Sequence, residues 1–342
     1  MTPAAGAGKP FGATILDAEG LRLTADEKAF FREADPFGFI IFGRNVDSPD
    51  QLRALCDEMR DAVGRNAPIT VDQEGGRVQR LRAPHWTDWT PPLDFAAAAG
   101  ARAAEAFYLR YRIIAHELHS VGIDSNCAPM LDLASHETHA FLRNRCYGSD
   151  PETVARLGRA AAEGLLAGGV LPVAKHMPGH GRSTLDSHHD LPHVKTPKDA
   201  LADSDFAPFR ALADLPMAMT AHLVFEDIDD VPATQSATVM RLIREEIGFD
   251  NLVMSDDLSM NALSGSYFER TRRALEAGCD VALMCNRSLA ERAETADAAG
   301  RMSAPAQARA ERALAARRNP DDIDIADARA QLETLLSGRD NV

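Results

Sequence analysis

The feature of this sequence that most constrains its fold is a regular alternation of short apolar runs with amphipathic segments of helical period. Eight apolar runs have the length and composition of buried strands, at residues 13–16, 38–42, 69–71, 123–129, 170–174, 218–220, 252–254 and 281–284. Strands that alternate with helices indicate parallel βαβ units. We therefore predict an α/β fold, a single (β/α)8 TIM barrel, with a doubly wound open sheet as the alternative.

Polar residues follow nearly every predicted strand. They are Asp17, Arg44, Asp72, Asp132, Lys175 with His176, His222, Asp256 and Asn286. In a TIM barrel the carboxyl ends of the strands, and the loops after them, build the active site. An open sheet brings fewer strand ends to one crevice, so this pattern favours the barrel.

Helix signals lie between the predicted strands. Residues 48–64 open with SPDQL and close on a glycine, as helix caps predict. A second segment has Asp94 as its expected N-cap and an apolar stripe of helical spacing formed by Phe107, Tyr111, Ile114 and Leu118.

Residues 288–337 are rich in Ala and Arg and are expected to hold the last barrel helix and C-terminal packing helices. No linker rich in Gly, Pro or Ser divides the sequence. We therefore expect one catalytic domain over residues 1–342, with a barrel core at about 11–300 and C-terminal helices at about 301–338.

Composition narrows the function classes. The net charge of −14 disfavours binding to nucleic acid or to an anionic membrane, because phosphate contacts require clustered Lys and Arg. No run approaches the ~20 apolar residues of a membrane helix, and the opening MTPAAGAGKPFG lacks a signal peptide pattern. The five cysteines are scattered, which is typical of free thiols in a reducing compartment. The cysteines thus favour a cytoplasmic protein. We also expect a monomer, which the charge does not decide.

Two segments place charged groups after strands. In VMSDDLSM (253–260), Asp256 and Asp257 are adjacent, so at most one is expected to face a substrate directly, as nucleophile or base. The alternative is that one of them caps the next helix. In VDQEGGRVQR (71–80), Asp72 and Arg80 either clamp a polar ligand or form a structural salt bridge. Downstream, Trp86 and Trp89 either stack on a sugar ring or pack the loop.

The stretch AKHMPGHGRSTLDSHHDLPH (174–193) holds five of the 11 histidines. A metal site, an acid/base loop and a polar surface loop are all compatible with it. His176 and His180 have helical i,i+4 spacing, but Pro178 and Gly179 between them exclude a helix. Asp186 and His188 can form an acid/base dyad, because a nearby carboxylate orients an imidazole that titrates near neutral pH.

Several motifs in order resemble glycoside hydrolase family 3, in particular its bacterial β-N-acetylglucosaminidases of cell-wall recycling. They are VDQEGGRVQR, APMLDL (128–133), RCYGSDP (145–151), KHMPGHG with DSHHDLP, and SDDLSM, and the match extends over about residues 11–290. Met177 stands where Phe or Ile is usual in the family. Cys146 and Tyr147 stand where Ser and Phe, in that order, are usual. None of these differences removes a catalytic group.

The resemblance implies a (β/α)8 barrel and a retaining mechanism that needs no cofactor or metal. It assigns the nucleophile to Asp256 and the acid/base role to His188 paired with Asp186. The implied substrate contacts are Asp72, Arg80, Arg145, Lys175 and His176. The implied substrate is a muropeptide carrying a terminal β-linked N-acetylglucosamine.

Three alternatives remain at this point: a phosphorylase with the same site, a metal-dependent barrel hydrolase that uses the histidine cluster, and a non-catalytic muropeptide sensor. The glycines of the 174–193 stretch also predict a mobile loop that carries His188 into place when sugar binds. His180, His189 and His193 have no assigned role.

Overall fold

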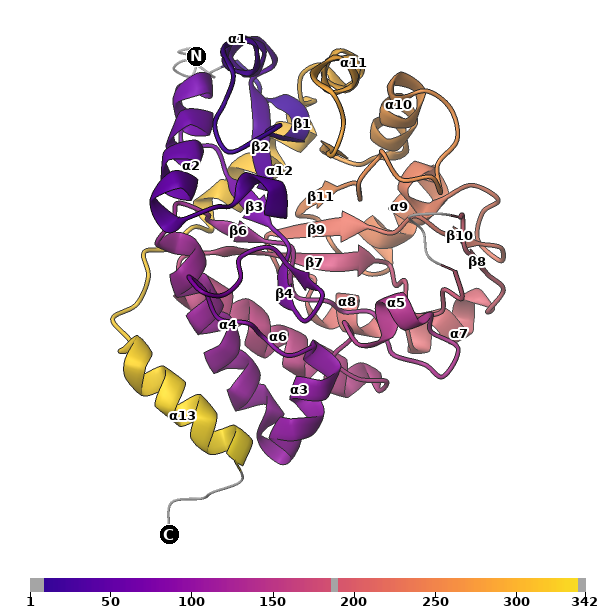
Figure 1. Cartoon of the computed structure of the whole chain (residues 1–342). Coiled ribbons are helices and arrows are strands. Elements are labelled where there is room, and N and C mark those ends of the chain that lie inside the picture. The colour runs from indigo at the N-terminus through magenta and orange to yellow at the C-terminus, as the bar shows by residue number, and fades with distance from the viewer. Residues whose placement is uncertain (1–8, 186–189, 338–342) are drawn as a thin grey trace, which may run out of the picture.

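The strands form a central ring that helices surround (Figure 1). The computed structural model describes residues 9–185 and 190–337. Within these residues the ring contains eight parallel strands: β1 (Gly12–Asp17), β2 (Pro36–Ile41), β3 (Ile69–Val71), β6 (Ser125–Asn126), β7 (Leu171–Met177), β9 (Met217–Thr220), β11 (Leu252–Met254) and β12 (Ala282–Met284). Each overlaps one of the eight predicted apolar runs, so the strand prediction is confirmed.

The ring consists of two four-stranded sheets, in the orders β12–β1–β2–β3 and β11–β9–β7–β6. At one seam, the backbone N–H groups of Asp124 and Cys127 donate to carbonyl oxygens of β3. At the other seam, Met254 of β11 forms a parallel bridge with Val281. The strands therefore follow one another around the barrel in chain order, as in a TIM barrel, and the open-sheet alternative is wrong.

Each strand of the ring is followed by a helix, or a pair of helices, on the outside: α1 (Ala25–Ala34), α2 (Pro49–Val63), α4 (Ala103–His119), α6 (Pro151–Ala167), α7 (Lys198–Asp203) with α8 (Ala207–Ala211), α9 (Ala237–Glu245), α10 (Tyr267–Ala277) and α11 (Leu289–Ala299). The α2 caps are as predicted. Ser48 accepts the N–H of Gln51, and Gly64 ends the helix with φ +65°, a conformation that glycine adopts without strain. Among the described helices, none is both long and apolar enough to span a bilayer.

The Asp94 cap is a wrong prediction. Asp94 lies in the first turn of a separate helix, α3 (Pro92–Ala99), whose N-cap is Pro91. The apolar stripe belongs to α4, which begins at Ala103 after the 3-10 turn η2 (Gly100–Arg102). A carboxylate in the first turn still stabilises the positive end of α3.

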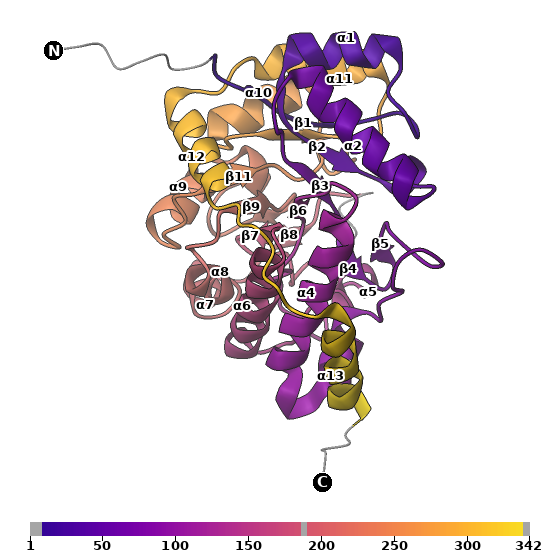
Figure 2. The same ribbon diagram turned by 90° about the vertical axis from the view of Figure 1, so that its left-hand side faces the viewer.

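The barrel interior is closed at one end and open at the other. Inward-facing side chains such as Ile15 and Val173 pack with Ala306 and Ala310 of α12 (Ala304–Ala315), which covers the amino ends of the strands. The last helix, α13 (Ile325–Ser337), instead packs against α4, away from α12 (Figure 2). Since α12 covers the amino ends of the strands, the barrel interior is accessible, within the described residues, from the carboxyl ends of the strands.

Short elements line that open side. They are the hairpin β4 (Gln73–Gly75) and β5 (Val78–Gln79), the turn η1 (Gly43–Asn45), the helix α5 (Ala140–Arg143), the paired strands β8 (His193–Val194) and β10 (Val224–Phe225), and the turn η3 (Ala233–Gln235). Gly75 has φ +111°, and a Cβ there would lie 2.9 Å from the carbonyl oxygen of Thr90. Only glycine allows the hairpin to pack this closely.

Candidate active site

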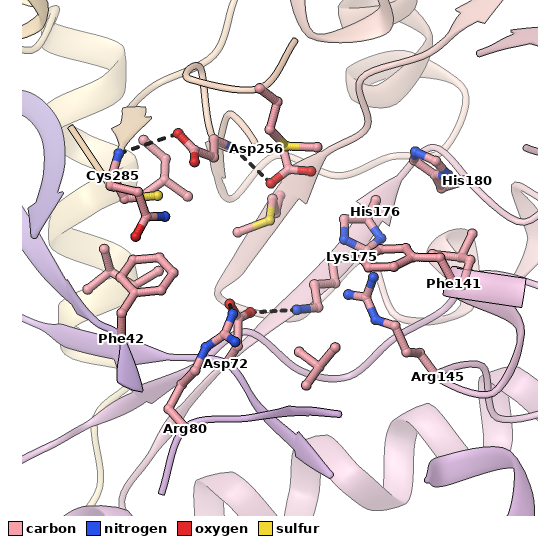
Figure 3. Close-up of a pocket in the computed structure, with 18 of the residues that line it drawn as sticks. Phe42, Asp72, Arg80, Phe141, Arg145, Lys175, His176, His180, Asp256 and Cys285 are labelled. Carbon is pink, nitrogen blue, oxygen red and sulfur yellow. Dashed lines mark hydrogen bonds and ion pairs between the residues drawn. The ribbon is translucent and has the colours of Figure 1, made fainter. Parts of the chain in front are cut away.

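A pocket of about 300 Å³ opens among the carboxyl ends of the barrel strands (Figure 3). Six of the eight predicted site residues line it: Asp72, Arg80, Arg145, Lys175, His176 and Asp256. The other two, Asp186 and His188, lie outside the described residues. The glycines on which the mobile loop was predicted, Gly179 and Gly181, are described, and the mobility itself stays a prediction. The structure therefore brings together the predicted nucleophile and all five predicted substrate contacts.

One wall of the pocket is a network of paired charges. Asp72 accepts from Arg80 at 2.9 Å and from the Lys175 ammonium at 2.8 Å. Behind it, Glu74 accepts both a second Lys175 contact at 2.6 Å and a bidentate pair of bonds from Arg145 at 2.9 and 2.8 Å. We call Asp72, Glu74, Arg80, Arg145 and Lys175 the ion-paired wall.

Burial and charge oppose each other in this wall. Burial by itself raises the pKa of Glu74, but Arg145 and Lys175 more than compensate and hold that pKa at about 2. Asp72 behaves in the same way: burial raises its pKa, and Lys175 and Arg80 bring it below the ordinary range. Both carboxylates are therefore ionised at neutral pH.

Of the two alternatives for Asp72 and Arg80, the structure shows the salt bridge, and the ligand clamp stays a prediction. They form a salt bridge, yet their side chains remain 18% and 26% exposed and line the pocket. Lys175 is only 2% exposed, and two of its three donors already bond carboxylates. Asp72 and Arg80 thus present the accessible polar groups, and Lys175 chiefly fixes the Asp72 carboxylate.

An aromatic residue stands next to this wall. The Phe141 ring of α5 lies 3.5 Å from the Arg77 guanidinium carbon and 5.5 Å from that of Arg145, which are cation–π distances. His139 accepts the Phe141 N–H at 3.2 Å through Nδ1, and both side chains line the pocket. The sequence reasoning missed His139 and Phe141 because nothing in the motifs marks them.

A buried carboxylate organises the two histidines that follow β7. Asp132 is fully buried; its Oδ2 lies 2.7 Å from His176 Nδ1, and its Oδ1 accepts the His180 backbone N–H at 2.6 Å. Burial raises the pKa of Asp132, and the contacts with His176 outweigh burial and lower it. Asp132 therefore holds the His176 ring at the pocket, and the contact of His176 with the substrate stays a prediction.

The opposite wall holds the acidic pair after β11. Ser255 fixes this turn, because its N–H donates to Val281 O and its Oγ accepts the Leu283 N–H, both at 2.9 Å. Asp256 Oδ1 accepts the Asp257 N–H at 2.8 Å, and the Asp256 side chain faces the pocket across from Asp72 (Figure 3).

Asp257 has a different role from its neighbour. Its carboxylate accepts the backbone N–H groups of Ser259 at 2.9 Å and Cys285 at 3.4 Å, so it ties the β11 and β12 loops together. Burial raises its pKa. The expectation that one of the two Asp residues caps the next helix is wrong, because Ser266 and Glu269 form the capping box of α10.

Other sequence predictions are settled by position. Trp86 and Trp89 are both 8% exposed and pack in the hydrophobic core, so the packing interpretation is confirmed. All five cysteines are buried, and none of them forms a disulfide bond. One of them, Cys285, lines the pocket, but burial raises the pKa of its thiol well above the usual value, which disfavours a thiolate nucleophile.

Three of the five histidines of the 174–193 stretch lie in the described residues, and they occupy two places. His176 and His180 lie in the pocket, His193 is at the surface 3.2 Å from Glu226, and His189 lies outside the described residues. Over residues 9–185 and 190–337, no group of three or more His, Cys, Asp or Glu is arranged to hold a metal ion.

The fold and the pocket define the class of the protein: a (β/α)8-barrel enzyme whose site joins a carboxylate to a charged binding wall. Comparison with known proteins gives the family. Glycosyl hydrolase family 3 N terminal domain matches residues 16–315. This span is most of the chain, so the protein belongs to glycoside hydrolase family 3 and is a glycosidase.

Its relatives agree with this assignment. A protein named Beta-hexosaminidase from Alkalilimnicola ehrlichii is 39% identical over 283 residues, which cover 80% of this chain and 81% of the relative. Another of the same name from Bordetella avium is 37% identical over 81% of each chain. Native NagZ from Neisseria gonorrhoeae, a solved structure, superposes with a TM-score of 0.83 at 31% identity, covering 96% of this chain and 97% of that one.

Proposed function

We propose that this glycosidase is a retaining β-N-acetylhexosaminidase that removes terminal β-linked N-acetylglucosamine from cell-wall muropeptides. One observation carries the proposal: the Asp256 carboxylate faces a pocket whose opposite wall presents Asp72 and Arg80. The names of the relatives support the hexosaminidase activity. A complex of Neisseria gonorrhoeae NagZ with N-trifluoroacetyl-D-glucosamine supports an N-acylated glucosamine as the sugar.

Each wall supplies one part of the chemistry. On the ion-paired wall, the Asp72 carboxylate accepts hydrogen bonds from sugar hydroxyls, and the Arg80 guanidinium donates to their oxygens. Lys175 and Arg145 hold the two carboxylates of that wall in place. On the opposite wall, Asp256 attacks the anomeric carbon, and the bond from that carbon to the leaving oxygen breaks.

His188 completes the cycle in this proposal. It donates a proton to the leaving oxygen in the first step and removes a proton from water in the second, so that water releases the sugar from Asp256. An imidazole with an unperturbed pKa of ~6.5 suits both steps near neutral pH. Asp186 orients it. The resemblance in the motif DSHHDLP supports these two assignments.

We also propose that the whole chain acts as one catalytic domain, as a monomer in the cytoplasm, without a cofactor. Five unbonded cysteines support a reducing compartment. Sedimentation of the purified protein and fractionation of the cells that produce it test the oligomeric state and the location.

The main test compares a chromogenic N-acetyl-β-glucosaminide with the plain β-glucoside. We expect the wild type to cleave the first and not the second. Asp256→Ala should lower kcat by about 10⁴-fold or more with the fold intact, because it removes the nucleophile. The matched control is Asp61→Ala, which removes an exposed carboxylate of α2 that does not line the pocket. Retained activity in Asp256→Ala would refute the nucleophile assignment.

The acid/base assignment is tested with leaving groups of different acidity. His188→Ala should lose most activity on substrates with a poor leaving group and less on activated ones, which need no proton in the first step. His193→Ala, a surface histidine, is the control. An equal loss on all substrates would argue for another role, and faster turnover in phosphate buffer with a sugar phosphate product would favour the phosphorylase.

A further inference from the structure

His180 follows β7 in a segment that packing holds tightly. Its backbone N–H donates to the buried Asp132 at 2.6 Å. Gly179 before it has φ +144°, and a Cβ there would lie 3.0 Å from the Asp205 side chain; a Cβ on Gly181 after it would clash with the backbone of Leu133. The chain on both sides of His180 therefore packs directly against neighbouring loops, which fixes the position of the imidazole.

The His180 imidazole is buried without satisfying its hydrogen-bonding groups. The residue is 4% exposed, and neither ring nitrogen has a hydrogen-bond partner in the described part of the chain. A buried polar group without a partner is costly, so it is found where a ligand or another group fills the gap. His176, by contrast, has its Nδ1 paired with Asp132.

His180 also lines the pocket, on the same side as His176 (Figure 3). The two rings meet edge to face with centroids 5.6 Å apart. Burial, followed by the repulsion of His176, lowers the pKa of His180 to about 4. At neutral pH the ring is therefore uncharged and offers one N–H donor and one nitrogen acceptor to the pocket.

The charges around His180 select the kind of ligand. Asp132 and Asp256 both act electrostatically on its ring, and both are acidic. An anionic ligand group would be repelled there, and a neutral imidazole supplies no positive charge to hold it. A hydroxyl both donates and accepts, so it matches either ring nitrogen.

We propose that His180 is a sugar-binding residue, whose imidazole hydrogen-bonds one hydroxyl of the N-acetylglucosamine ring held between Asp256 and the ion-paired wall. This role rests on the proposed function, because the pocket must hold that sugar. It adds a substrate contact that the motif reasoning left unassigned.

The test couples variants of His180 with deoxy substrates. His180→Phe removes both nitrogens and keeps a flat ring, whereas His180→Gln keeps a donor and an acceptor. Each is assayed on the chromogenic N-acetyl-β-glucosaminide and on its 3-, 4- and 6-deoxy forms. His193→Phe at the surface is the matched control.

We expect His180→Phe to lower kcat/KM on the parent substrate about 10-fold or more, since the hydroxyl loses its partner. On one deoxy substrate the variant and the wild type should agree within about twofold, which identifies the hydroxyl. His180→Gln should recover part of the loss and provides the comparison if His180→Phe does not fold.

Two outcomes would overturn the role of His180. They are unchanged kcat/KM in both variants, and an equal loss on all four substrates, which would mean a packing role. If the wild type cleaves none of the N-acetylglucosaminides, the proposed function itself fails. If the wild type is active but the loss in His180→Phe is the same with and without each hydroxyl, only the role of His180 is refuted.

Discussion

The two walls of the pocket hold their carboxylates in different ways. On the ion-paired wall, Asp72 and Glu74 are neutralised by Lys and Arg side chains at 2.6–2.9 Å. On the other wall, the partly buried carboxylate of Asp257 is held by backbone N–H groups and the Ser259 hydroxyl. One wall is stabilised by charge, and the other by hydrogen bonds that do not depend on a buried cation.

This difference gives the two walls opposite responses to pH. The folded pKa of Glu74 lies below its ordinary value, so its contribution to stability is present above about pH 4.5 and is lost as the pH falls toward 2. The folded pKa of Asp257 is raised, so its contribution is present at low pH and is lost as the pH rises through the folded pKa. The walls can therefore be separated by measuring unfolding at several pH values.

The largest effect on the free energy of unfolding is expected when a negative charge of the ion-paired wall is removed. Glu74→Gln leaves Arg145 and Lys175 buried with only Asp72 to balance them. We expect the free energy of unfolding at pH 7 to fall by about 3–5 kcal/mol, as when a buried ion pair loses one partner. Urea unfolding measures this loss of stability, and the difference between the variant and the wild type should shrink as the pH approaches 2.

The control for this prediction is a surface ion pair of similar geometry. Asp214 pairs with Arg159 at 2.5 Å but is 67% exposed. Asp214→Asn should therefore cost no more than about 1 kcal/mol. Equal losses in the two variants would contradict the claim that burial makes the Glu74 network important.

The next effect concerns binding at the accessible edge of the same wall. Arg80→Ala removes one of the two cationic partners of Asp72 and one expected donor to the sugar. We expect kcat/KM to fall about 10- to 100-fold, chiefly through KM, because charged hydrogen bonds contribute about 1.5–3 kcal/mol. Arg53→Ala, which breaks a surface pair with Asp50 on α2, is the control and should leave KM unchanged.

The smallest change in the free energy of unfolding is expected for a substitution in the opposite wall. Asp257→Asn keeps an oxygen to accept the N–H groups of Ser259 and Cys285 but removes a partly buried charge. At pH 7 the variant should unfold with the same or a slightly higher free energy than the wild type, and the difference should vanish in acid. A large loss at pH 7 would mean that this wall also depends on charge.

The eight strands were predictable because their apolar runs are short and are separated by segments with helix signals. The polar residues after them, including Asp72, Lys175 and Asp256, were predictable because a barrel gathers its strand ends at one mouth. Glu74 was within reach of the same reasoning: it lies two residues after Asp72, and alternate residues of an extended strand share a face.

Other parts of the site depend on tertiary packing that local patterns do not encode. The roles of Asp132 and His180 arise from burial beside another loop, and Phe141 meets the pocket only because α5 folds over it. The Asp94 cap failed for a related reason. A short helix, α3, intervenes before α4, and one acidic residue suits both a cap and a first turn.

The most direct test of the central claim is to trap the sugar on the enzyme. The wild type is incubated with a fluorinated N-acetylglucosaminyl fluoride that reacts quickly in the first step and slowly in the second, and the product is analysed by intact mass and peptide mapping. We predict one added sugar per chain, located on Asp256, and no addition in Asp256→Ala. An adduct on another residue, or an active enzyme that inverts the anomeric configuration and never forms an adduct, would contradict the account.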